Sequence, residues 1–68
     1  MSKESEFFIY LLEAYAAYKK TSPSTIYKLW DKLGLVDTII SMYEMYHIER
    51  IENAFDDIDR LTSEKRVS

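Results

Sequence analysis

In Leu29-Trp30-Asp31-Lys32-Leu33-Gly34-Leu35-Val36-Asp37-Thr38-Ile39-Ile40, the only glycine of the chain separates two segments whose apolar residues recur at helical spacing. Gly34 suits the left-handed backbone conformation that commonly ends a helix, and Leu35 is placed to make the hydrophobic contact that often accompanies such a cap. Asp37 is the best N-cap for the helix that follows, because its carboxylate can accept from free backbone N–H groups. The stretch therefore predicts two helices joined by a Gly-centred turn.

The other helices follow from capping residues and apolar periodicity. Ser2 can cap a first helix, and Ser22 followed by Pro23 marks the start of a second one. From Ile40 to Leu61 the helical spacing continues without Gly or Pro, so one long helix and two shorter helices both stay open. We favour a break at 48–50, because so short a chain must fold back on itself to cover its apolar faces.

The predicted fold class is therefore all-α, a small bundle of three to four short helices. It forms one domain of residues 1–63, followed by a frayed tail at 64–68. The helices are expected at about 3–20, 23–33, 37–47 and 51–63.

Composition excludes several classes of protein. The 68 residues contain no cysteine, which excludes a disulfide framework, a thiolate zinc site and a cysteine nucleophile. Acidic residues precede the first apolar run, unlike in a signal peptide, and no apolar run approaches the roughly 20 residues that span a bilayer. We expect a cytoplasmic protein that has no membrane partner and no cofactor.

The helix-turn-helix pattern raises the question of DNA binding. The second helix would have to present basic or amide side chains to the DNA, yet no Lys or Arg lies between Lys32 and Arg50, and the net charge is −3. These charges argue against nucleic acid as a partner. An alternative is a DNA-binding dimer in which basic residues of both copies contact the DNA. These residues would be Lys19, Lys20, Lys28 and Lys32.

Two polar motifs could carry chemistry. Glu44 and His47 are spaced like half of a di-iron carboxylate site, but the chain has one histidine, so only a homodimer could supply the second half. Otherwise His47 is a partly buried histidine that holds a neighbour by a hydrogen bond. The carboxylates of Asp56, Asp57 and Asp59 could hold Mg²⁺ or Ca²⁺, but on a helix they fan outward and form an acidic face for a basic partner.

The aromatic content is high for so small a core. Six Tyr, three Phe and one Trp could build an aromatic core or be partly exposed as anchors of an interface. No nucleophile with a base and an orienting acid stands at a diagnostic spacing, and there is no glycine-rich phosphate loop, so we expect no enzymatic activity.

The chain also resembles a family of short, uncharacterised bacterial proteins classed as a domain of unknown function. The resemblance covers nearly the whole chain and rests on the order of its motifs: Ser2-Lys3-Glu4, Glu6-Phe7, Ser22-Pro23-Ser24, Tyr27, Tyr43-Glu44, His47 and Asp56-Asp57-Ile58-Asp59. Where such proteins often carry Leu-His-Thr-Gln-Gly, this chain has Tyr46-His47-Ile48-Glu49-Arg50, which favours a turn after His47. Proteins of this family tend to be encoded beside a larger protein resembling an ADP-ribosyltransferase toxin, so the resemblance implies an antitoxin or accessory role.

We therefore expect a small module that binds and restrains a partner protein, with a toxin-like protein as the expected partner. A homo-oligomeric packing module without another partner stays as a further alternative. The expected contact residues are Tyr43, Glu44, His47, Asp56, Asp57 and Asp59.

Overall fold

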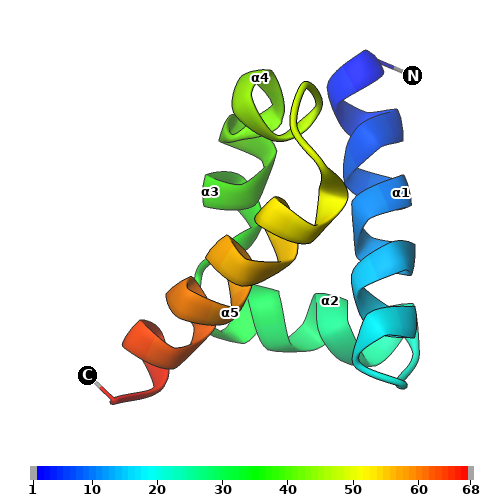
Figure 1. Ribbon diagram of the computed structural model, residues 1–68. Helices are drawn as coiled ribbons and strands as arrows, with labels where there is room; N and C mark the ends of the chain where they lie inside the picture. The colour runs from blue at the N-terminus through cyan, green and yellow to red at the C-terminus, as the bar shows by residue number, and fades with distance from the viewer. Residues whose placement is uncertain (1, 68) are drawn as a thin grey trace.

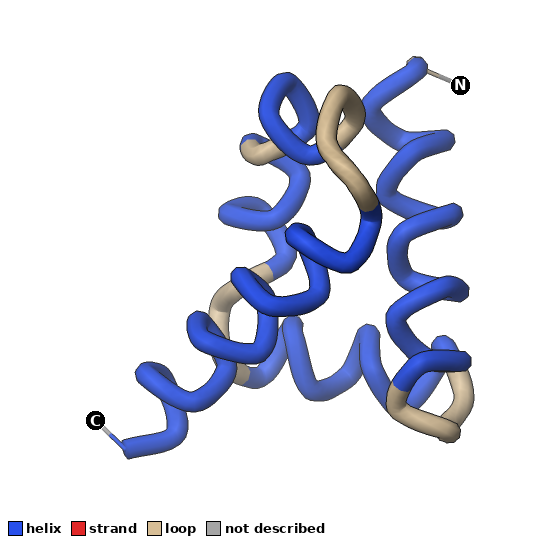
Figure 2. The backbone as a smooth tube through the Cα atoms, viewed as in Figure 1, coloured by secondary structure: helices blue, strands red, loops and turns tan. Residues whose placement is uncertain are grey.

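The structure is a computed structural model that describes residues 2–67, with side chains from residue 2 to residue 66. It contains five helices and, within the described residues, no strand, so the all-α prediction is confirmed (Figures 1 and 2). No helix in residues 2–67 combines the length and the apolar character needed to cross a bilayer. The helices are α1 (Lys3–Tyr18), α2 (Pro23–Lys32), α3 (Val36–Ser41), α4 (Tyr43–Tyr46) and α5 (Ile51–Val67).

The first two helices begin where the capping residues predict. The Ser2 hydroxyl accepts from the backbone N–H of Ser5 at 3.1 Å, and the Ser22 hydroxyl accepts from that of Thr25 at 3.2 Å. Pro23 occupies the first turn of α2, where its missing N–H costs no hydrogen bond. Local side chains therefore decide where α1 and α2 start.

Both helices end in the same backbone motif, although with different residues. At the end of α2, Gly34 has φ 72°, and the Leu35 N–H donates to the Trp30 carbonyl at 2.8 Å, as predicted for a glycine cap. α1 ends at Tyr18, two residues before the predicted end. There Lys20 takes the left-handed position with φ 58°, which is strained for a residue with a Cβ.

The third predicted helix, 37–47, is wrong as a single element. It begins at Val36 and breaks at Met42 into α3 and α4. Asp37 lies in the first turn of α3 and is not its N-cap; the cap position belongs to Leu35, whose carbonyl accepts from the N–H of Ile39 at 2.9 Å. Since Leu35 both closes α2 and opens α3, the chain reaches α3 without a separate capping residue.

The end of the last predicted helix, 51–63, is also wrong, because α5 continues to Val67. The extra turn follows a buried residue, Thr62, whose hydroxyl donates to the Ile58 carbonyl at 2.8 Å, and the guanidinium of Arg60 pairs with Glu64 at 3.3 Å. Residue 68 of the predicted tail and residue 1 of the predicted domain lie outside the described residues. The break favoured at 48–50 is confirmed, because α4 ends at Tyr46 and α5 begins at Ile51.

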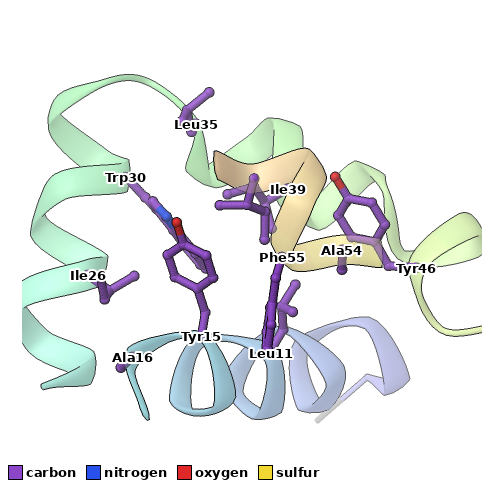
Figure 3. Packing of buried hydrophobic residues seen from close by; sticks show 11 residues of the cluster. Leu11, Tyr15, Ala16, Ile26, Trp30, Leu35, Ile39, Tyr46, Ala54 and Phe55 are labelled. Atoms are coloured by element: carbon purple, nitrogen blue, oxygen red, sulfur yellow. The ribbon is translucent and has the colours of Figure 1, made fainter. Parts of the chain in front are cut away.

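The helices α1, α2 and α3 form three sides of a frame, and α5 lies diagonally across it (Figure 1). Side chains from all five helices meet in the core beneath α5 (Figure 3). Trp30 is fully buried and packs against Tyr15 and Phe8 at ring distances of 5.6 and 5.8 Å. The buried residues are Leu11, Tyr15, Ala16, Ile26, Trp30, Leu35, Ile39, Tyr46, Ala54, Phe55, Ile58 and Thr62.

Candidate functional site: an aromatic row beside a polar seam

Four ring side chains from α1 and the α4 region form a continuous row, here called the aromatic row: Phe7, Tyr10, Tyr43 and His47. Phe7 lies 6.2 Å from Tyr10 and meets the edge of Tyr43 at 5.6 Å between ring centroids. Tyr43 in turn stacks on His47 at 4.3 Å with an angle of 4° between the planes. The row therefore bridges the N-terminal half of α1 and the last turn before α5.

Helical spacing places both pairs of the row. Phe7 and Tyr10 lie three residues apart on α1, and Tyr43 and His47 lie four apart, so each pair projects from one helical face. A hydrogen bond also fixes the imidazole, because its Nδ1 lies 2.6 Å from the Tyr43 carbonyl oxygen. A carbonyl oxygen only accepts, so Nδ1 is the donor in this contact.

The row is a partly exposed surface. Tyr10 keeps 55% of its area accessible and His47 is exposed, while Phe7 and Tyr43 are half-buried. His47 therefore differs from the partly buried histidine considered from the sequence, although it does hold a neighbour by a hydrogen bond. The exposed Glu44 lies next to Tyr43 in the chain.

The three carboxylates of the predicted acidic face have different surroundings. Asp57 accepts a hydrogen bond from the hydroxyl of Tyr46 and forms an ion pair with Arg60. Asp59 accepts from the hydroxyl of Tyr15 and pairs with Lys19 at 2.8 Å. Asp56 is exposed. Two of the three carboxylates therefore fasten α5 to other parts of the chain.

We call these two sets of contacts the polar seam; it consists of Tyr46, Asp57 and Arg60 at one end and Tyr15, Asp59 and Lys19 at the other. The hydrogen bond from Tyr46, followed by that from Arg60 and its charge, holds the pKa of Asp57 below its ordinary value. For Asp59, partial burial acts to raise the pKa, but hydrogen bonds from Lys19 and Tyr15 outweigh it and lower the pKa.

The pKa values of the two phenols of the seam, Tyr15 and Tyr46, shift in the opposite direction to those of the carboxylates. Burial, together with the hydrogen bond to a carboxylate and its negative charge, raises the pKa of Tyr15 and of Tyr46 well above the ordinary value of a phenol. Both side chains are therefore neutral donors throughout the physiological range. The seam is a set of charge-assisted hydrogen bonds, which are stronger than bonds between neutral groups.

Two clefts flank α5. The larger, of about 480 Å³, lies between α1, α2 and α5, and the smaller, of about 300 Å³, lies between α5 and the segment 42–49. The smaller cleft includes two methionines, Met42 and Met45, and the Tyr46 end of the seam. Among residues 2–66, no three His, Cys, Asp or Glu side chains come together as a group that could hold a metal ion.

The structure separates the residues predicted to bind a partner. Tyr43 and His47 belong to the aromatic row and Glu44 is adjacent, whereas Asp57 and Asp59 belong to the seam. Tyr46, which belongs to the same turn as Tyr43, is buried and donates to Asp57 of α5. Sequence reasoning missed Phe7 and Tyr10, since only their three-residue spacing on α1 hinted at a shared face.

Comparison with known proteins identifies the family. A family model described as "Protein of unknown function (DUF3791)" matches residues 6–65, so the chain belongs to this family. A search of curated proteins and a search of solved structures each returned no match.

Proposed function

We propose that this DUF3791 chain is a small protein-binding module that restrains a toxin-like partner, as an antitoxin or accessory protein, and that the aromatic row is its contact surface. The observation that carries the proposal is the row itself, in which four ring side chains pack on one another and two of them, Tyr10 and His47, are exposed. Aromatic side chains of this kind supply much of the binding energy in protein interfaces.

Charge favours a basic surface on the partner. The exposed Glu44 follows Tyr43 in the chain, and the chain as a whole carries a net charge of −3. Complementary charge would speed association and select the partner, with an effect that weakens in salt. Of the acidic triplet, Asp56 is the residue whose charge is most available to a partner, because Asp57 and Asp59 already have intramolecular partners.

The toxin-like identity of the partner rests on the family resemblance described above, in which such proteins are encoded beside an ADP-ribosyltransferase-like protein. The direct experiment co-expresses the tagged chain with that neighbouring protein and measures co-purification in low and in high salt. A stoichiometric complex, weaker in high salt, is expected. A chain that purifies without the neighbour in both salts contradicts the proposal.

A matched pair of tyrosine variants tests the surface. Tyr10→Ala removes an exposed ring of the aromatic row, while Tyr27→Ala removes a comparably exposed ring on α2, outside the row. If Tyr10 is an interface anchor, its loss should weaken the complex at least about tenfold, and the loss of Tyr27 should change it little. Equal effects of the two variants would refute the assignment of the row.

The alternatives are outcomes of simple measurements. The unit formed by α2, Gly34 and α3 has the order of a helix-turn-helix, but α3 has six residues and no Lys or Arg, which weakens the case for DNA binding. A gel shift at low salt would reveal even non-specific DNA binding through Lys19 and Lys20, which follow α1, and Lys28 and Lys32 of α2. Light scattering on the isolated chain would reveal a homo-oligomer.

A further inference from the structure

The cleft between α1, α2 and α5 is large enough to hold a small molecule. Its volume of about 480 Å³ falls within the range of small-molecule binding sites, roughly 300–1,000 Å³. The cleft lies apart from the aromatic row, so a ligand bound in it would not depend on the proposed protein partner. The lining residues are Tyr15, Lys19, Ile26, Leu29, Asp59, Thr62, Ser63 and Arg66.

The lining is divided by chemistry. Ile26 and Leu29 of α2 contribute apolar surface, while Ser63 and Arg66 of α5 contribute a hydroxyl and a guanidinium. Ser63 and Arg66 lie three residues apart on α5 and therefore project from one face of the helix. A molecule that fits this lining has an apolar body and a polar head that accepts hydrogen bonds.

The charged residues of the lining indicate the charge that the polar group of the ligand should carry. Lys19 is neutralised by Asp59 at 2.8 Å, but within residues 2–66 Arg66 has no carboxylate partner. The three charged lining residues therefore leave one positive charge, in a chain whose net charge is negative. A single negative charge would be balanced by Arg66, whereas a second would have no counter-charge in the lining.

We infer that this cleft binds a small organic monoanion, a carboxylate carried on an apolar body. The carboxylate accepts from the guanidinium of Arg66, whose planar fork matches the two oxygens, and from the Ser63 hydroxyl. The apolar body lies against Ile26 and Leu29 and leaves water as it binds.

The protein carries its own reporter for this site. Trp30 is the only tryptophan, and its ring lies 5.6 Å from that of Tyr15, which lines the cleft. The Trp30 Nε1–H is buried and has no hydrogen-bond partner among the described residues. A ligand that shifts Tyr15 changes the surroundings of this indole, so tryptophan fluorescence of the intact chain follows binding.

The test titrates the full chain with phenylacetate and hexanoate, compared with the neutral 2-phenylethanol and the dianionic phenyl phosphate. Saturable binding of the two carboxylates is expected, roughly in the millimolar range for ligands of this size in an open cleft. The neutral and dianionic probes should bind at least about fivefold more weakly. Equal binding of all probes, or no saturable response to the carboxylates in fluorescence and in thermal stability, overturns the inference.

Two variants locate the site. Arg66→Gln should weaken carboxylate binding about tenfold, because it removes a charge-assisted hydrogen bond. Arg50→Gln is the matched control, since Arg50 pairs with Glu52 and does not line the cleft. Equal affinity of the two variants contradicts the assignment. Ser63→Leu, at an exposed helical position, should fill the cleft and abolish binding while circular dichroism shows an intact fold.

Discussion

The hydrogen bond from Tyr46 to Asp57 offers the sharpest test of how α5 is held. Tyr46 is 4% exposed and comes from the short turn α4, while Asp57 lies on α5 across the break at 48–50. Replacing Tyr46 with phenylalanine removes one oxygen atom and keeps the buried ring. The change therefore leaves the packing intact and deletes only the bond to the carboxylate.

The expected loss of stability follows from the kind of bond. A hydrogen bond to a charged group contributes roughly 1.5–3 kcal/mol, but Asp57 keeps its ion pair with Arg60 and contact with water, so we expect about 1–2 kcal/mol. In a domain of this size, each kcal/mol lowers the melting temperature by about 4–8 °C. The loss would be a large part of a total stability that is marginal in small domains.

The pH dependence of this stability loss tests whether the Asp57 carboxylate is the hydrogen-bond partner of Tyr46. The pKa of Asp57 is lowered in the folded chain, so its contribution to stability is fully present above the unfolded value of about 3.9 and is lost as pH falls through the lowered folded pKa. Tyr46→Phe removes the largest cause of this lowering. The difference in stability between the wild type and the variant should therefore shrink below about pH 4.

Urea denaturation of both proteins between about pH 3 and pH 7 measures this difference. Tyr43→Phe is the control, because the Tyr43 hydroxyl has no hydrogen-bond partner among the described residues, and its removal should change stability by less than about 0.5 kcal/mol. A loss in Tyr46→Phe that is the same at pH 3 and pH 7, or no larger than that of the control, would refute the reasoning.

Raising the pH above about 10 should lower the free energy of unfolding, because the phenols of Tyr15 and Tyr46 keep their protons in the folded chain when the unfolded chain has lost them. Urea titrations from neutral to alkaline pH measure this, and a flat profile would contradict it. Gly34→Ala should cost about 1 kcal/mol, because alanine is strained at φ 72°. The added Cβ would meet no atom within 4 Å beyond the adjacent residues of the chain, so the cost comes from the backbone. A thermal melt equal to that of the wild type would contradict this. Lys20→Gly should raise the free energy of unfolding by about 0.5 kcal/mol. Glycine removes the backbone strain at φ 58° after α1, and this gain exceeds the loss caused by the higher conformational entropy of glycine in the unfolded chain. A melting temperature below that of the wild type would contradict this.

The helix starts and the Gly34 turn could be predicted because they depend on neighbouring residues. Ser2 and Ser22 bond to backbone groups three positions away, and Gly34 closes α2 through bonds to the preceding turn. The break after α4 followed from chain length and the need to cover an apolar face. These features require no knowledge of which helices later meet.

The candidate site could be predicted only in part. Tyr43, Glu44 and His47 were selected, but Phe7 joins them from a distant part of the sequence by packing against the edge of Tyr43. The acidic triplet was expected to face solvent as a unit. Tyr15 and Tyr46 instead donate to two of its members, and neither tyrosine is close to its partner in the sequence.

By itself the sequence determined the all-α class, the starts of α1 and α2 and the left-handed turn at Gly34, because local hydrogen bonds and backbone preferences act over a few residues. Only the tertiary structure decided the aromatic row and the pairing of Asp57 and Asp59. Both depend on which side chains of different helices meet. Such meetings reflect burial and charge compensation between segments far apart in the chain, which apolar periodicity does not encode.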